Sequence, residues 1–380
     1  MDKYRPSYRR RKKRKNWAFE IIAAVGAVLL IICAYAGHID PRSFIGAPFM
    51  MLAFMPMLVI MLVLLVAALI WRRWLAVLVA VLSIIATLPV LKYFIGMNSV
   101  DNIPPTPADK SLILKVMTYN VLSFNYNEGS LGGKPSATMK LILDADPDVV
   151  LMQEGGAAGL DWEDVPSLKP YISQVRSKFP YMYCCPEGLN ILSKYPFTTK
   201  PLGDVRQGRS PLGYNRDMTS YLARAYDLNM PSGKQLRLID FRLQSYQLSF
   251  GKSPNVRVSP DVKLAPLERM RRSFALRGDD AATLRQAIDE SPANVILCGD
   301  MNDVSQSFVY HVISGDDLKD VWAEVGRGYG NTYNRHGLSY RIDQVLYRGD
   351  LRALEIKRIK GGSSDHYPLM ATFDIEITDK

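Results

Sequence analysis

Three long apolar runs lie within the first hundred residues, and they constrain the fold more than any other feature. They cover residues 17–37, 44–70 and 74–91. The second run has no charged residue, and the first contains only Glu20, close to its start. About 20 apolar residues cross the ~30 Å hydrocarbon core of a bilayer. We therefore expect a transmembrane region of three helices within residues 17–97, in which the prolines are tolerated kinks.

The distribution of charge predicts which side of the membrane each part faces. The chain has 47 Lys/Arg and 37 Asp/Glu residues, a net charge of +10. Nine of the basic residues lie in the tail, residues 1–16, and Arg72 and Arg73 form the turn between the second and third runs. Basic loops stay in the cytoplasm. We therefore expect a multi-pass protein of the cell (inner) membrane, with everything after residue 97 outside the cytoplasm.

Three other interpretations of this region remain open. The basic tail is also typical of segments that bind nucleic acid or acidic lipids. "AYA" at 34–36 resembles a signal-peptidase site, so the first run is alternatively a cleaved signal. The third run, which is shorter, is alternatively a buried core helix. Cleavage of the first run would leave the orientation of the later domain unchanged.

The chain beyond the apolar runs reads as a linker and one domain. "DNIPPTPADKS" at 101–111 is rich in Pro and polar residues, so a linker is expected over 98–111. The domain, residues 112–380, is long enough for a large core. From Asp101 onward, 34 basic and 34 acidic residues balance, and this part shows no overall basic footprint for long nucleic acid.

Strand-like patterns outnumber helical patterns in this domain. "SATMKLILDAD" at 136–146 and the stretch 267–287 have apolar residues at helical spacing. "SYLARAYDLNM" and "KQLRLIDFRLQS", joined by "PSG", predict a hairpin. We therefore expect an α+β fold of two mainly antiparallel sheets, packed face to face with helices outside.

Polar side chains stand at or near the ends of five apolar runs. A single acidic residue in such a place is usually a turn residue. Five such places are hard to explain as turns alone, and carboxylates with an imidazole on one rim suit a site for Mg²⁺ and phosphate. These residues are Asn120, Glu154, Asp300 with Asn302, Asp343, and Asp365 with His366.

Five motifs in order carry a family resemblance. They are "MTYNVLSF", "LMQEG", "GDMND", "RIDQVLY" and "SSDHYPLMATF". Together they resemble the endonuclease/exonuclease/phosphatase superfamily, which has the deoxyribonuclease-I-like four-layer α/β-sandwich. The resemblance runs from about Leu112 to Ile377, and it implies a hydrolase of phosphoester bonds: a phosphodiesterase, a phosphatase or a nuclease.

The resemblance also implies a metal site. Glu154 of "QEG" would be the direct Mg²⁺ ligand, helped by Asn120, and Mn²⁺ is the alternative ion. Asp365 of "SDH" would support the metal or its waters.

The remaining motifs imply the catalytic groups. Asp300 of "GDMND" would orient or deprotonate the attacking water, and Asn302 would hydrogen-bond a phosphate oxygen. Asp343 would pair with His366, because a carboxylate fixes the tautomer of an imidazole and favours its charged form. A charged His366 would then stabilise charge on the phosphoryl group.

One departure from the family pattern concerns Arg242. Family members often have a histidine in a mid-domain "HLxS" stretch, where this chain reads "DFRLQS". Arginine can hold a phosphate bidentately, but it does not donate a proton at neutral pH. The alternative is therefore a catalytically weak or inactive protein that binds phosphoesters. Another alternative for Arg242 is a solvated strand residue.

The sequence leaves the substrate open between nucleic acid, lipid and small phosphoesters, with a preference for the last two because the domain is neutral and attached to a bilayer. It indicates no protein partner. Asp320 and Thr332 are expected to be structural, and His311 and His336 to lie on helix and loop surfaces. The chain has no "GxSxG", so serine hydrolase chemistry is not expected.

Overall fold

The computed structural model describes residues 17–98, 112–124, 134–156, 162–185, 188–202, 223–231, 233–245, 266–335 and 338–375. The basic tail, nearly all of the expected linker, and His336 lie outside these residues. The chain divides into two compact units. Among the described residues, the smaller contains 17–34 and 53–88, and the larger contains 35–52 and those from 89 onward.

The smaller unit consists of apolar helices. α1 (Ala18–Tyr35), α3 (Phe54–Ile70) and α4 (Trp74–Leu91) follow the three predicted runs. Within this unit, Arg73 lies 3.2 Å from Glu20, which gives the one acidic residue of the first run a counter-ion. The helices Ala18–His38 and Trp74–Leu91 are each long and apolar enough to cross a membrane.

The second run differs from the single helix that we expected. α2 (Gly46–Leu52) and α3 are separate helices with a bend of 52° between them, and only the pair together is long enough for a third span. Pro56 explains the break, because it has no N–H to donate to the carbonyl of Leu52 and its ring clashes with that carbonyl in a continuous helix.

The larger unit contains two six-stranded sheets. The first sheet has the order β15 (Arg352–Arg358), β16 (Leu369–Asp374), β2 (Ile113–Asn120), β3 (Val149–Gln153), β5 (Asn190–Ser193), β4 (Tyr181–Tyr183). The second has the order β10 (Lys319–Asp320), β14 (Asp343–Arg348), β9 (Val295–Asp300), β8 (Gln235–Arg242), β7 (Ala223–Asn229), β6 (Phe197–Leu202).

Each sheet has one parallel pair of neighbours among antiparallel ones. β2 pairs with β3 in parallel, and so does β8 with β9. The remaining neighbours within both sheets are antiparallel. β7 and β8 form the predicted hairpin. The predicted fold of two mainly antiparallel sheets is therefore confirmed.

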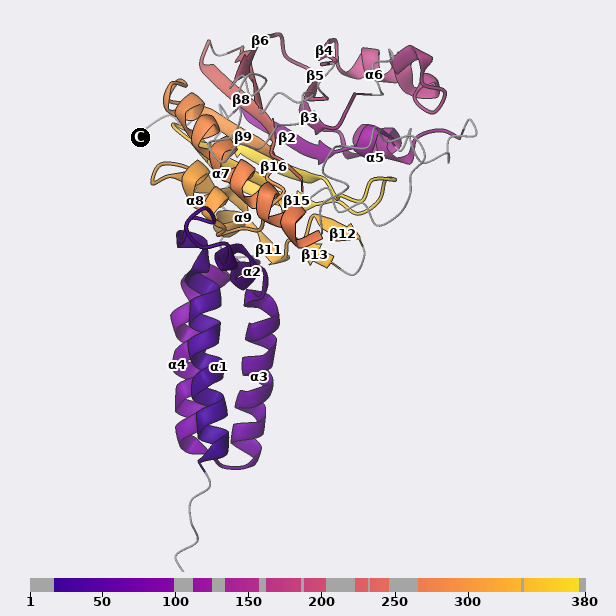
Figure 1. Cartoon of the computed structure of the whole chain (residues 1–380). Coiled ribbons are helices and arrows are strands. Elements are labelled where there is room, and N and C mark those ends of the chain that lie inside the picture. The colour runs from indigo at the N-terminus through magenta and orange to yellow at the C-terminus, as the bar shows by residue number, and fades with distance from the viewer. Residues whose placement is uncertain are drawn as a thin grey trace, which may run out of the picture. The chain divides into compact units, whose positions relative to one another are not determined.

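Helices cover the outer faces of the sheets (Figure 1). α7 (Pro266–Asp289) and α8 (Phe308–Ser314) lie on the second sheet, and α5 (Ala137–Ala145) and α6 (Ile172–Lys178) lie on the first. Successive side chains of a strand point to opposite faces of the sheet, so each strand contributes both to the core between the sheets and to the contacts with the helices. Val116 and Ile296 point into the core between the sheets, whereas Met117 and Leu297 point toward the helices.

Shorter elements complete the larger unit. They are η1 (Ala36–His38), η4 (Trp162–Asp164), η5 (Lys169–Tyr171), α9 (Val321–Val325), and the strand pairs β1 (Ile95–Met97) with β11 (Arg327–Tyr329) and β12 (Tyr333–Arg335) with β13 (Leu338–Tyr340).

Asp320 has the structural role that the sequence predicted. Its carboxylate lies 2.8 Å from the Arg341 guanidinium, and both side chains are 1% exposed. The same carboxylate accepts from the Tyr310 hydroxyl and from the backbone N–H groups of Trp322 and Ala323, so it also caps α9. It thereby ties α8, α9 and the start of β14 together.

We predict that Asp320→Asn lowers the free energy of unfolding by about 3–5 kcal/mol, because it leaves a buried guanidinium without its counter-ion. Urea unfolding of the detergent-solubilised chain measures it. Lys357→Gln is the control: it breaks an ion pair with Glu355 whose side chains are about half exposed, and should cost under about 0.5 kcal/mol. Equal effects of the two variants would contradict the prediction.

Candidate active site

The predicted site residues gather at one rim of the two sheets, because of how the strands run. Asn120 ends β2, Glu154 follows β3, Arg242 ends β8 and Asp300 ends β9. These are the carboxyl ends of the two parallel pairs. Their antiparallel neighbours begin at the same rim: Asp343 starts β14 opposite Asp300, and Asp365 and His366 precede β16, which pairs with β2.

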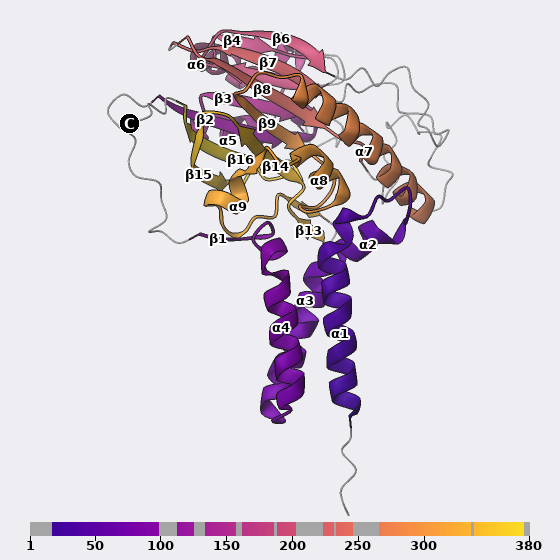
Figure 2. The same cartoon turned by 90° about the vertical axis from the view of Figure 1, so that its left-hand side faces the viewer.

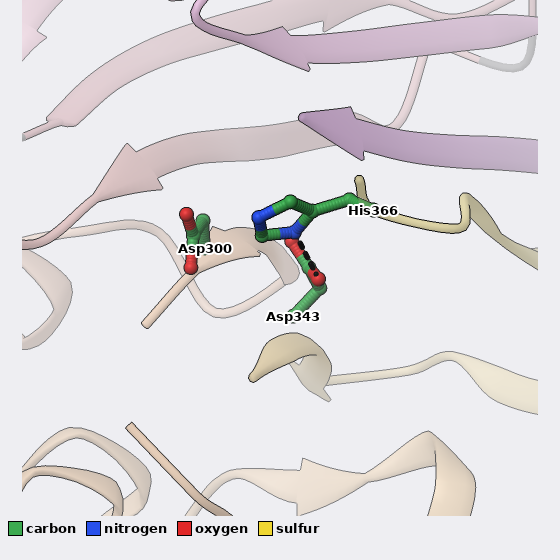
Figure 3. A group of neighbouring side chains, drawn as sticks. All are labelled: Asp300, Asp343 and His366. Carbon is green, nitrogen blue, oxygen red and sulfur yellow. Dashed lines mark hydrogen bonds and ion pairs between the residues drawn. The ribbon is translucent and has the colours of Figure 1, made fainter. Parts of the chain in front are cut away.

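Asp343 and His366 form a buried pair. His366 Nδ1 lies 2.8 Å from Asp343 Oδ2, and the two side chains are 7% and 3% exposed. Figure 3 shows the imidazole between Asp343 and Asp300, with its other nitrogen on the Asp300 side. One potential ligand atom from each of these three residues lies within 4.8 Å of the other two.

Electrostatics keep His366 charged. Burial alone would lower its pKa, but the charge and hydrogen bond of Asp343, together with Asp300 and Asp365, raise the pKa to about 10. The pairing therefore gives His366 a positive charge at neutral pH.

Asp300 is held by three hydrogen bonds. Its Oδ1 accepts from the backbone N–H of Asn302 at 2.8 Å, and its Oδ2 accepts from Asn302 Nδ2 at 3.1 Å and from Asn120 Nδ2 at 3.0 Å. Burial nevertheless raises the pKa of Asp300 to about 6, with His366 opposing this shift and Asp343 adding to it. Asp300 is therefore a carboxylate at neutral pH, but a more basic one than an exposed aspartate.

Glu154 shares the rim with two hydrogen-bond donors. Arg242 NH2 lies 2.7 Å from Glu154 Oε1, and Asn120 Nδ2 donates to the same oxygen at 3.0 Å. Burial would raise the pKa of Glu154, but Arg242, Asn120 and His366 outweigh it and lower the pKa. Glu154 has a left-handed backbone with φ of 53°, which costs energy and is common at functional sites.

Both asparagines use their amide nitrogens within the protein. Asn120 Nδ2 bridges Glu154 and Asp300, and its Oδ1 accepts from the backbone N–H of Leu122. Asn302 Nδ2 donates to the Leu243 carbonyl as well as to Asp300. In this arrangement both amides orient carboxylates.

Asp365 lies beside the central group. Its Oδ2 is 3.2 Å from Arg335 NH1. Its Oδ1 is buried and has no hydrogen-bond partner among the described residues, and the same holds for Oδ1 of Asp343.

Three residues support the site in ways that the sequence did not predict. Ser364 Oγ donates to the Asn120 carbonyl at 2.6 Å and accepts from the backbone N–H of His366, so it joins β2 to the histidine turn. Thr332 Oγ1 accepts from the backbone N–H of Asp343. Asp303 is paired with the buried Arg277 of α7 at 3.3 Å. The "SSDH" and "GDMND" motifs contain Ser364 and Asp303, but only the fold shows what they contact.

His311 has surroundings that the sequence did not predict. It lies on α8 as expected, but its ring stacks on that of His38, with centroids 4.0 Å apart. Burial and the charge of His38 lower the pKa of His311 to about 4.

The fold and this rim define a class of protein, the α/β-sandwich hydrolases of phosphoester bonds. The model of the endonuclease/exonuclease/phosphatase family matches residues 117–366, more than half of the chain. The chain belongs to this family, whose members are phosphoester hydrolases. A second model, described only as a domain of unknown function, matches residues 16–93. No curated protein matches the chain.

This chain matches three solved structures over nearly the whole length of those structures. D. rerio TDP2 in complex with a single-strand DNA product is 17% identical, with 69% of this chain and 99% of that chain covered and a TM-score of 0.45. Sphingomyelinase C from Streptomyces griseocarneus is 17% identical, with 69% and 99% covered and a TM-score of 0.42. A beta toxin variant from Staphylococcus aureus with bound magnesium ions is 15% identical, with 68% and 99% covered and a TM-score of 0.43.

We predict that the stability supplied by the His366–Asp343 pair depends on pH. The pKa of His366 is raised from 6.5 to about 10 in the folded protein. The contribution is therefore full below about pH 6.5 and is lost as pH rises to about 10, because only the unfolded chain releases the proton in that window. Urea unfolding of wild type and His366→Gln at about pH 6, 8 and 9.5 measures the difference in their free energies of unfolding.

His311→Gln is the matched control, because its pKa shift has the opposite sign. The stability that neutral His311 supplies is present above about pH 6.5 and falls as pH decreases toward about 4. If the difference in free energy of unfolding between wild type and His366→Gln stays constant from about pH 6 to 9.5, the charged pair is refuted.

Proposed function

We propose that this chain is a membrane-anchored, Mg²⁺-dependent phosphoester hydrolase whose active site lies outside the cytoplasm. The observation that carries the proposal is the buried Asp343–His366 pair facing Asp300, with one potential ligand atom from each of the three within 4.8 Å of the others. The balance of 34 acidic and 34 basic residues from Asp101 onward favours a lipid or small phosphoester over long nucleic acid.

The residues present fit a divalent cation. Glu154, Asp300, Asp343 and Asp365 supply four carboxyl groups, and buried oxygens of the last two have no hydrogen-bond donor among the described residues. Oxygen donors of this kind suit Mg²⁺ or Mn²⁺. Glu154 and Asp365 would hold the ion, and Asn120 would orient Glu154. When bound, the ion would stabilise charge on the phosphoryl oxygens.

Asp300 is our candidate for the group that activates water. Above about pH 6 its carboxylate can accept a proton, and its three hydrogen bonds fix its direction. A positioned base of this kind contributes about 10²–10⁴-fold to a rate. Asn302 would act by holding Asp300, because both of its amide hydrogens already have acceptors. A direct contact of Asn302 with phosphate would require its amide to turn.

Arg242 and His366 are our candidates for binding the phosphate. Both are cations beside Asp300: Arg242 is its neighbour across the β8–β9 pair, and the His366 ring faces it (Figure 3). A guanidinium can bind two phosphate oxygens. Since Arg242 cannot supply a proton, we assign protonation of the leaving group to the His366 imidazolium.

The alternative function is binding of phosphoesters without turnover. It rests on Arg242, which occupies the place of the family's usual histidine and forms an ion pair with Glu154. This ion pair would compete with a metal ion for the carboxylate.

The full chain in detergent should hydrolyse at least one of DNA, RNA, phospholipid or sugar phosphate in the presence of Mg²⁺, and EDTA should stop the reaction. Glu154→Gln and His366→Ala should each lower kcat by about 10²-fold or more. Asp144→Asn is the control, because Asp144 is an exposed carboxylate of α5, and it should retain the wild-type rate. No turnover of any of the four classes by a folded wild-type chain would favour the binding protein.

The proposed orientation is tested by reporter fusions. Alkaline phosphatase, which becomes active only outside the cytoplasm, should be active when fused after Asn102 and inactive when fused after Arg73. The physical reason is the retention of the basic tail and of the Arg72–Arg73 turn on the cytoplasmic side. The reverse pattern of activity would overturn the orientation.

A further inference from the structure

Two segments next to the apolar helices belong to the larger unit. Residues 35–52 and 89–98 pack with the sandwich rather than with the helical unit. The expected transmembrane region, residues 17–97, had included nearly all of both. Each of them reaches the loop of residues 301–307, which follows Asp300 directly and contains Asn302. We call this the catalytic loop.

η1 lies in direct contact with the catalytic loop. A Cβ added at Gly37 would lie 1.7 Å from the backbone oxygen of Gln306 and 2.9 Å from its carbonyl carbon. Only glycine allows so close an approach of two backbones. The next residue, His38, stacks on His311 of α8, the helix that begins where the catalytic loop ends.

The catalytic loop has a backbone that requires support. Asn302 and Gln306 have φ angles of 50° and 66°, in the left-handed region. Such residues cost free energy and persist only where their surroundings hold them. Gln306 is 7% exposed, and the Gly37 backbone forms part of its surroundings.

The segment after α4 reaches the same loop through a chain of hydrogen bonds. Arg341 NH2 donates to the Tyr93 carbonyl at 2.7 Å, and Arg341 NH1 donates to Gln344 Oε1 at 2.6 Å. Gln344 Nε2 then donates to Ser305 Oγ at 3.1 Å. Because Gln344 follows Asp343, this chain supports both the catalytic loop and the strand that carries Asp343.

Three further contacts fix the first segment. Arg42 lies 2.9 Å from Asp279 of α7. Phe49 of α2 meets Phe274 edge to face at 5.3 Å, where α2 lies beside α7 (Figure 2). The Tyr340 hydroxyl donates to the Leu52 carbonyl at 3.3 Å, the carbonyl that lacks a helical donor because residue 56 is proline.

We propose that η1 is a positioning element of the active site, and that Gly37 is a positioning residue for Asp300 and Asn302. Through Gln306, the Gly37 backbone sets the course of the catalytic loop and thereby the direction of the Asp300 carboxylate. The role of this carboxylate in turnover rests on the proposed function, whereas its position does not.

The test compares two glycine-to-alanine variants of the full chain in detergent. In Gly37→Ala the new methyl meets the Gln306 backbone. Gly46 lies nine residues after Gly37, and the three atoms nearest to its new methyl all belong to the ring of Phe44, which is 46% exposed and free to turn. We expect Gly37→Ala to lower kcat at least about tenfold with KM unchanged, since an error of about 1 Å at a reacting group costs up to ~10²-fold. Gly46→Ala should match wild type.

A second readout needs no turnover. The chain has four histidines, so NMR of ¹³C-labelled imidazoles resolves His366, whose ring faces Asp300. Its resonance should shift in Gly37→Ala and not in Gly46→Ala. If wild type hydrolyses nothing, the proposed function fails, and this shift still decides the positioning role.

Each outcome of these experiments either supports or overturns the positioning role of Gly37. A folded Gly37→Ala variant with wild-type kcat and an unchanged His366 resonance overturns the proposal. If Gly37→Ala does not fold, His38→Ala decides in its place, because it removes the stacking on His311 without adding volume. A lower kcat of His38→Ala at constant KM, with a shifted His366 resonance, supports the positioning role. A wild-type kcat together with an unchanged resonance overturns it.

Discussion

The site depends on one feature of strand pairing, the single parallel pair at the centre of each sheet. β2 and β3 end together in the first sheet, and β8 and β9 end together in the second. Since the sheets pack face to face through these strands, four carboxyl ends reach one rim, and the antiparallel neighbours β14 and β16 start there. Every proposed functional side chain comes from one of these six strand ends. A fully antiparallel arrangement would divide the same residues between opposite rims.

The charged groups at this rim determine one another's pKa values. Asp343 keeps His366 cationic, His366 and Arg242 keep Glu154 ionised, and burial leaves Asp300 the most basic of these carboxylates for which a shift is resolved. The pKa values of Glu154 and Asp300 are thus moved in opposite directions by their surroundings, the condition under which two carboxylates can serve different roles. Arg242 adds a positive charge that does not titrate at neutral pH.

The sequence predicted this rim well, because each of its residues ends or starts an apolar run, and that pattern survives in the strands. It did not predict that residues 35–52 and 89–98 pack with the larger unit. Parts of both segments continue apolar runs, and the polar stretch at 38–43 does not show by itself which surface it contacts. Pro56 accounts for the break at Leu52, but Pro89 lies inside α4 without ending it, so the positions of the prolines alone did not predict the break. The fit of Gly37 against Gln306, and the ion pair between Arg242 and Glu154, join residues far apart in sequence, and no local pattern encodes them.

The docking of residues 35–52 also sets an order of assembly during synthesis. Arg42 and its partner Asp279 are separated by 237 residues. At about 5–20 residues per second, the ribosome delivers the partner roughly 10–50 s after the segment itself has emerged. Residues 35–52 therefore emerge well before their partner on α7, and the catalytic loop acquires its full support only after Gln344 has been translated.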